Sequence, residues 1–310
     1  MKRTIRWGTS IIVLILLAYA ATTLDWRAIG ATVRHSSPPL LAAATLVNLL
    51  SLSVKGMRWS VFLRRIGVRS LRMAIESTFV GAGVNNIMVA NSGEAARVLL
   101  VSRGTGVSRA SVLATLALDR IFDPLCYLLL LLVAAGIVPL PAQLAHARAI
   151  AVVLLALVLA ATVWLTVRRS TDIAVTDAPR SWRARLRRFR GDLTSLASVE
   201  RMCAAFTLSV VVWASQLMTF HLVARASGIR MPLAGDVAAL LLTNAGLILR
   251  ATPANVGYFQ FAYAVAAKPF GVPANAAIAA ALLLQAVQII PVTVLGMIAA
   301  PQFLRRASHV

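Results

Sequence analysis

The sequence predicts an all-α fold, a polytopic membrane helical bundle with about six transmembrane helices plus two re-entrant hairpins in an inverted repeat. Three observations lead there: the composition is strongly apolar, arginine is concentrated in a few loops, and two apolar segments are interrupted by polar residues and glycine. We treat residues 1–310 as a single integral membrane domain.

Composition excludes the soluble classes. Of the 310 residues, 59% are hydrophobic and 13% are charged, and the mean hydropathy is +0.82. Soluble domains are about 45–50% apolar and about 25% charged, so a water-soluble enzyme with one packed core is excluded. Disorder is excluded as well, because it requires low hydrophobicity.

The charge is strongly asymmetric, with 31 Lys and Arg against 10 Asp and Glu and a formal net charge of +21. In a membrane chain this excess is typical of cytoplasmic loops. Nucleic-acid binding is not expected, because no basic segment is interleaved with aromatic residues. We expect a multi-pass protein of the cell inner (plasma) membrane, with both termini in the cytoplasm.

The first two crossings are predicted at residues 8–24 and 38–54. Lys2, Arg3 and Arg6 precede the first run, which also resembles a cleaved signal peptide because residues 18–20 imitate a cleavage site. The loop after the second run is placed in the cytoplasm by six basic residues: Lys55, Arg58, Arg64, Arg65, Arg69 and Arg72.

Residues 73–100 are apolar but interrupted. Basic residues flank this segment on both sides, which predicts a hairpin that enters and leaves from the cytoplasmic face. Such a re-entrant backbone is tolerated only where protein or a water-filled cavity surrounds it. The interruptions are Gly81, Gly83, Asn85, Asn86, Asn91, Ser92, Gly93, Glu94 and Arg97.

The remaining elements continue the alternation. Residues 110–138 cross outward, 149–167 cross back, and 202–224 cross outward again. Between them, residues 168–201 carry nine arginines and predict a cytoplasmic loop with a helix on the inner leaflet. Residues 233–268 predict a second hairpin, entering from the opposite face, and residues 276–300 form the last crossing before Arg305 and Arg306.

This order divides the chain into pseudo-repeats at 1–138 and 149–300. Each half has two helices, a hairpin and a helix, and the odd number of crossings inverts one half relative to the other. Gly106 follows the first hairpin and Gly271 follows the second, and Arg120 and Gln285 lie at the same spacing beyond them. Inverted repeats with broken segments are typical of secondary transporters, whose substrate site lies at the breaks.

Candidate substrate-binding residues lie at both breaks. Asn91 is a candidate helix cap, and Glu94 completes a capping box; Thr252 precedes a proline in the second break, with Asn255 just beyond. Half-helices beginning there would direct free N–H groups at an anionic ligand such as a lipid phosphate. Ordinary capping of loops at the membrane surface explains the same residues.

Five charged residues extend this site. Arg97, Arg120 and Arg250 suit phosphate, because the guanidinium fork binds two oxygens at once. Asp119 and Asp123 offer them partners, and the alternative is a set of internal ion pairs that lock the bundle. A second alternative is a pair of carboxylates holding Mg²⁺ in a transferase. We expect no cofactor and no bound metal.

The chain resembles the family of the lysylphosphatidylglycerol synthase transmembrane region, from about residue 38 to 300. The motifs that carry the resemblance are Arg58-Trp59, Phe79-Val80-Gly81 with Asn85-Asn86, Gly93-Glu94 with Arg97, Asp119-Arg120 with Asp123, and Pro253 with Gly257 before Gly271-Val272. The family often has Glu where Gln260 stands and Arg where Gln285 stands, and it often has a proline before the Gly-Glu pair. These departures put a charge network in the second half in doubt.

The resemblance implies a flippase-like transporter that moves an anionic phospholipid or a polyprenyl or hopanoid-type lipid between leaflets. We expect no aminoacyltransferase domain and therefore no synthase activity. A membrane-embedded lipid-modifying transferase and a non-transporting accessory protein of a lipid pathway remain the alternatives. The expected partners are membrane lipids with an anionic headgroup, and an oligomer is compatible with the sequence.

Overall fold

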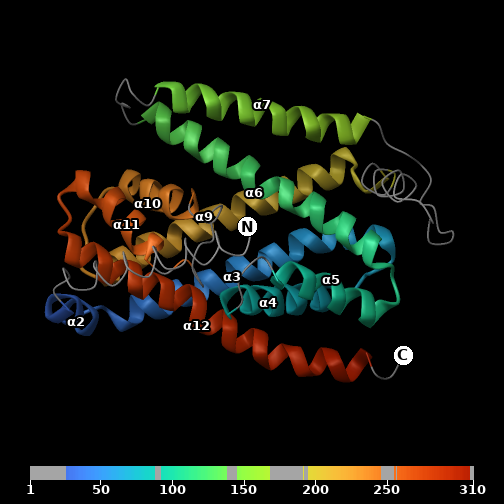
Figure 1. The fold of residues 1–310 in the computed structure, drawn as a ribbon, viewed down its shortest axis with the longest axis horizontal. Helices are drawn as coiled ribbons and strands as arrows, with labels where there is room; N and C mark the ends of the chain where they lie inside the picture. The colour runs from blue at the N-terminus through green and yellow to red at the C-terminus, as the bar shows by residue number, and fades with distance from the viewer. Residues whose placement is uncertain are drawn as a thin grey trace, which may run out of the picture. The chain divides into compact units, whose positions relative to one another are not determined.

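The computed structural model describes residues 26–87, 92–137, 145–167, 191, 195–245, 255 and 257–307, and these contain helices but no strand. Figure 1 shows their arrangement along the chain. The helices are α2 (Trp26–Arg34), α3 (Pro38–Leu63), η1 (Arg64–Ile66), α4 (Leu71–Ile87), α5 (Ser92–Thr105), α6 (Arg109–Ile137), α7 (Ala145–Val167), α9 (Val199–Ala226), α10 (Leu233–Ala245), α11 (Tyr258–Ala267), η5 (Lys268–Phe270) and α12 (Ala274–Ala307).

Several helices have the length and composition of membrane crossings. Within the described residues, Pro38–Ile66, Val199–Ala226 and Ala274–Ala300 are long and apolar enough to span a bilayer. The 29 residues of α6 extend about 43 Å at about 1.5 Å per residue, and α7 follows beside it (Figure 1). The predicted all-α membrane class is confirmed, while the first predicted crossing, 8–24, lies outside the described residues.

The surface of α7 fits a lipid environment. Large apolar side chains on this helix, among them Val153, Leu157 and Val163, are exposed. Water would penalise such a continuous apolar face, whereas lipid tails are as apolar as the side chains themselves. Most of the predicted basic loop that follows, 168–201, lies outside the described residues, and so does most of the helix predicted within it.

The chain forms two compact units. Among the described residues, unit 1 comprises 26–50, 82–87, 92–93, 215–245, 255 and 257–295, and unit 2 comprises 51–81, 94–137, 145–167, 191, 195–214 and 296–307. In unit 2, α3, α5 and α6 meet around Trp59, Val98 and Val112. In unit 1, α10 and α11 lie side by side (Figure 1), and Phe220 of α9 contacts Phe259 and Tyr263 of α11.

Both predicted interruptions are shorter than the sequence suggested. Helix α4 continues through Gly81, Gly83, Asn85 and Asn86 and ends at Ile87, and α5 begins at Ser92. Asn244 likewise lies within α10, where its side chain donates to the Leu240 carbonyl at 2.8 Å. Glycine is tolerated in membrane helices because neighbouring helices stabilise the backbone, so these residues do not end the helix.

One turn occurs in both halves of the chain with the same hydrogen bonds. After α3, Gly67 N–H donates to the Arg64 carbonyl and Val68 N–H to the Leu63 carbonyl; after α9, Gly228 and Ile229 donate to Arg225 and Ala224 in the same pattern. Both glycines have positive φ, 90° and 75°, which only glycine adopts without strain. Gly67 and Gly228 are 161 residues apart, the separation also of Ser51 and Val212, which are joined by a hydrogen bond.

Two glycines allow close approach of helix backbones in unit 2. A Cβ atom on Gly56 of α3 would lie 2.7 Å from Ile75 Cα of α4, and a Cβ on Gly296 of α12 would lie 2.7 Å from the Phe79 carbonyl oxygen. Real Cβ atoms do not approach backbone this closely, so a side chain at either position would force the helices apart. Small residues at helix contacts are typical of membrane bundles, where van der Waals packing holds helices together.

We expect Gly56→Ala to destabilise the protein by about 1–3 kcal/mol, because the added methyl group forces α3 and α4 apart. The measurement is the thermal unfolding temperature of the detergent-purified protein. Gly30→Ala in the middle of α2 is the control, since no heavy atom lies within 4 Å of its added Cβ, and alanine is the better helix former. Equal melting temperatures for the two variants would contradict the packing described above.

Candidate functional site

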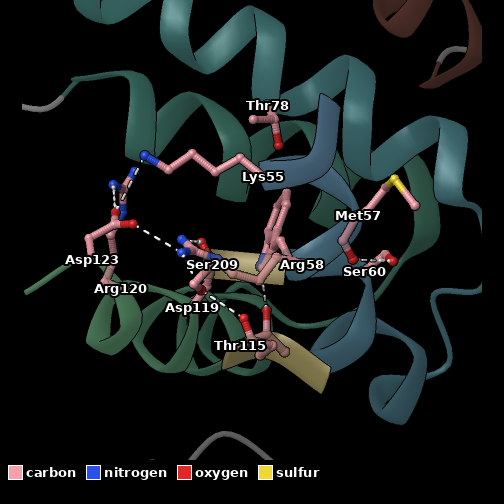
Figure 2. A network of polar contacts seen from close by, with 12 residues as sticks. Lys55, Met57, Arg58, Ser60, Thr78, Thr115, Asp119, Arg120, Asp123 and Ser209 are labelled. Atoms are coloured by element: carbon pink, nitrogen blue, oxygen red, sulfur yellow. Dashed lines mark hydrogen bonds and ion pairs between the residues drawn. The ribbon is translucent and has the colours of Figure 1, made fainter. Parts of the chain in front are cut away.

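Arg58 of α3 is fully buried in unit 2 and links three helices. Its Nε donates to Asp119 Oδ1 at 2.7 Å and its Nη2 to Asp119 Oδ2 at 3.2 Å. Its Nη1 donates to Asp123 Oδ1 and to Ser209 Oγ of α9, each at 3.0 Å (Figure 2). The planar guanidinium thus holds the Asp119 carboxylate with two parallel bonds, the strongest geometry for such a pair.

Asp123 follows Asp119 by one turn of α6 and collects further cations. Its Oδ2 accepts a hydrogen bond from Arg120 Nη1 at 3.0 Å and lies 3.6 Å from Lys55 Nζ. Figure 2 shows Asp123 between the side chains of Lys55, Arg58 and Arg120. Arg120 also binds Glu94 of α5, donating from Nε to Oε2 at 3.3 Å and from Nη2 to Oε1. The chain of ion pairs therefore runs from α3 through α6 to α5.

Arg97 of α5 is held differently from the other cations. Only 3% of the residue is exposed, and its guanidinium carbon lies 4.2 Å from the centre of the Trp59 ring. Trp59 is itself fixed, because its Nε1 donates to Thr115 Oγ1 at 3.0 Å. The nearest carboxylate contact is Glu94 Oε2, at 3.9 Å from Nη1, beyond hydrogen-bond distance.

Two donor atoms of Arg97 are left over. Within the part of the chain that the structure describes, its Nε and Nη2 are buried and have no hydrogen-bond partner. An unpaired buried donor costs about 1–3 kcal/mol, and more when the group is charged. The charged cluster thus offers a buried cation whose donors are suited to an anionic oxygen, and its seven members are Lys55, Arg58, Glu94, Arg97, Asp119, Arg120 and Asp123.

The structure brings together five of the six predicted site residues of the first half, Glu94, Arg97, Asp119, Arg120 and Asp123. It adds two that the sequence analysis assigned to a cytoplasmic loop, Lys55 and Arg58. That assignment was wrong, because α3 continues to Leu63 and carries both residues into the cluster. The signal that could have found them is the pair of acidic residues on α6, which need buried cations as partners.

The caps of the half-helices also differ from prediction. Asn85 Oδ1 accepts the hydrogen bond from Gly93 N at the start of α5, at 2.8 Å, and the Glu94 carboxylate accepts from Arg120. Asn91 lies outside the described residues. The N–H of Gly93 in the first turn of α5 is therefore capped by a side chain of the preceding helix, α4, which the spacing of Asn91 and Glu94 did not reveal.

The second predicted break is described only in part. Arg250 and Thr252 lie outside the described residues. Asn255 is buried and has a positive φ of 57°, which asparagine tolerates better than most residues. Helix α11 begins beyond Gly257, whose N–H donates to Gln260 Oε1 at 2.7 Å.

A pair of neutral side chains in unit 1 has nearly the same spacing along the chain as an ion pair in unit 2. Gln260 Nε2 of α11 donates to Gln285 Oε1 of α12 at 2.6 Å. Their separation of 25 residues nearly equals the 26 residues between Glu94 and Arg120. The two contacts therefore have similar spacing, and only the one in the first half is charged.

A second pair of contacts follows the same rule. Trp59 and Phe220 stand at matching positions before the two equivalent turns, and Arg97 follows Glu94 as Tyr263 follows Gln260. Arg97 lies over the ring of Trp59, and Tyr263 stacks on the ring of Phe220 with centroids 6.3 Å apart. The two contacts therefore match in spacing along the chain, with a buried cation in the first half and a phenol in the second.

Comparisons with known proteins agree with the motifs. A glycosyltransferase, AglD of Haloferax volcanii, is 29% identical over 115 residues, which are 36% of this chain and 18% of that protein. The matched stretch thus spans less than a fifth of that relative's length. The family described as the lysylphosphatidylglycerol synthase TM region matches residues 6–296, nearly the whole chain. The chain belongs to this family of membrane proteins, as its charged motifs in α3, α5 and α6 indicated.

Proposed function

We propose that the protein moves an anionic amphiphile between the leaflets of a cell inner membrane, with the phosphate of the headgroup bound by Arg97. The observation that carries this proposal is the pair of buried, unpartnered donors on Arg97 among the described residues. An arginine within a bilayer is costly unless it faces a partner or a cavity. A phosphate oxygen supplies the missing acceptor in the fork geometry that guanidinium favours.

The charge of the cluster supports one anion. Lys55, Arg58, Arg97 and Arg120 contribute four positive charges, and Glu94, Asp119 and Asp123 contribute three negative charges. The surplus of one positive charge lies on the side chain that lacks hydrogen-bonded partners. A phosphodiester carries one negative charge, so its binding leaves the cluster neutral, which is the favourable state in a medium of low dielectric constant.

The substrate class follows from the surroundings and the family. The cluster is carried in part by α3, which is long and apolar enough to cross a bilayer, so a substrate with lipid tails suits its surroundings. The family's description names lysylphosphatidylglycerol, an aminoacylated form of an anionic phospholipid, and the relative from Haloferax volcanii is named a glycosyltransferase. An anionic phospholipid fits best, and a polyprenyl or hopanoid-type lipid with an anionic group fits the same donors.

An inverted repeat supplies the means of alternating access. The equivalent turns at Gly67 and Gly228, and the matched pairs Glu94–Arg120 and Gln260–Gln285, support repeats at 1–138 and 149–300. In transporters with inverted repeats, one repeat moves against the other around a fixed site. This movement exposes the site to each leaflet in turn. On this topology both termini lie in the cytoplasm.

The transferase alternative is less well supported. Both oxygens of Asp119 accept hydrogen bonds from Arg58, and both oxygens of Asp123 face cations. Binding of Mg²⁺ between the two carboxylates would require breaking a buried ion pair. A lipid transfer by the wild-type protein that requires Mg²⁺ and stops when the ion is chelated would favour the transferase over the transporter.

We expect Arg97→Met to reduce lipid exchange by about tenfold to a hundredfold, the effect of losing a charged hydrogen bond of about 1.5–3 kcal/mol. Methionine keeps much of the volume that packs on Trp59, so the fold should be retained. Exchange is measured in proteoliposomes of phosphatidylcholine with fluorescent NBD-phosphatidylglycerol, as the fraction of probe that external dithionite reaches.

The matched control is Arg103→Gln, which removes an exposed arginine from the same helix. We expect it to exchange lipid at the wild-type rate. An Arg97→Met protein as active as wild type would overturn the assignment of the binding residue. Wild-type protein that gives no exchange above empty liposomes would favour the accessory role.

We expect Asp119→Asn to destabilise the fold by about 3–5 kcal/mol, because it leaves Arg58 buried with less compensating charge. The control is Arg72→Gln, which alters an ion pair whose arginine is 64% exposed and should change stability by about 0–1 kcal/mol. Thermal unfolding in detergent measures both. A small effect of Asp119→Asn would show that the Arg58 pair does not hold the helices together.

A further inference from the structure

His221 of α9 and Asp236 of α10 form a close pair in unit 1. The pair shares no residue with the charged cluster of unit 2. His221 Nδ1 lies 2.6 Å from Asp236 Oδ2. The Asp236 side chain is fully buried, whereas 29% of the His221 side chain is exposed. Within the described residues, the second carboxylate oxygen, Oδ1, is buried and has no hydrogen-bond partner.

Asp236 is the only acidic residue among the described residues of unit 1. The cations on neighbouring described elements are Arg225 on α9, Arg230 in the turn after α9, and Lys268 on η5, and all three are exposed. Arg225 acts electrostatically on Asp236. The buried titratable group on α11 is Tyr263, whose hydroxyl also has no partner in the described part of the chain.

The pair changes its net charge when it takes up one proton. With a neutral imidazole, Nδ1–H donates to Asp236 and the buried carboxylate retains an uncompensated negative charge, which is costly. When a proton binds at Nε2 of the partly exposed ring, the pair becomes an imidazolium and a carboxylate with no net charge. No bond other than this N–H forms or breaks, and the proton comes from water and returns to it.

We propose that His221 and Asp236 form a proton-binding site and that proton binding there drives the lipid exchange described above, on which this inference rests. On the proposed topology the pair lies towards the outer end of α9. It joins α9 to α10, one limb of the second predicted hairpin. Proton binding removes the cost of burying the uncompensated charge of the Asp236 carboxylate. The protonated state therefore favours the contact between α9 and α10.

The first measurement reads proton binding directly. Full-length protein is labelled with ¹⁵N-histidine and reconstituted in lipid nanodiscs, and the chain contains four histidines. The signal of His221 is assigned by its loss in His221→Gln. We expect the Nδ1 signal of His221 to show the hydrogen bond to Asp236 and to change in Asp236→Asn, and we expect the Nε2 signal to show uptake of a proton as the pH is lowered. A His221 ring that takes up no proton, or whose Nδ1 signal is unaffected by Asp236→Asn, would overturn the proposal.

The second measurement tests whether proton binding is coupled to lipid exchange. Proteoliposomes of phosphatidylcholine with NBD-phosphatidylglycerol are compared at equal pH on both sides and under an imposed pH gradient. We expect the gradient to accelerate exchange by the wild-type protein, and Asp236→Asn and His221→Gln to lose that acceleration. His35→Gln is the matched control, because His35 is exposed and bonds only to the Ala31 carbonyl one turn earlier on its own helix; it should keep the response.

The two proposals fail in different ways. Absence of exchange by the wild-type protein at equal pH would refute the proposed transport, and the nuclear magnetic resonance titration would then decide the proton site by itself. Normal exchange that does not respond to the gradient, together with proton binding at His221, would identify the pair as a structural ion pair and overturn the coupling. Thermal unfolding of Asp236→Asn and His221→Gln verifies that each variant is folded.

Discussion

The two-bonded pairing of Arg58 with Asp119 is the constraint on which the rest of the site depends. Neither side chain is exposed, and a charge removed from water is tolerated only with a partner and further hydrogen bonds. Satisfying Arg58 requires Asp119 and Asp123 on one face of α6 and Ser209 on α9. Satisfying Asp123 in turn positions Lys55 and Arg120, and Arg120 positions Glu94 of α5.

This chain of requirements explains why one arginine is left over. Each carboxylate of the cluster pairs with Arg58, Lys55 or Arg120. Arg97 has no hydrogen-bonded carboxylate and lies against the face of Trp59 instead. A cation over an aromatic ring keeps part of its electrostatic stabilisation while its N–H groups remain available. The proposed anion site therefore depends on how the structural ion pairs are distributed.

The two halves of the chain carry contacts of matching spacing that differ in charge. The amide pair of Gln260 and Gln285 and the stacked ring of Tyr263 have nearly the spacings that an ion pair and a buried arginine have in the first half. Such neutral replacements remove a desolvation cost and also remove any site for an anion. In the reading proposed here, one unit binds the headgroup and the other, through His221 and Asp236, binds the proton.

The sequence by itself determined that this is a membrane protein and identified most of its charged site residues. Its apolar composition required helices in a bilayer, and Glu94, Arg97, Asp119, Arg120 and Asp123 stood out because charges within apolar helices need partners. Only the tertiary structure decided which partners they have. In the sequence, Lys55 and Arg58 resemble loop residues, and His221 and Asp236 belong to separate segments. Their pairing could not be predicted, because it depends on which helix faces meet and not on spacing along the chain.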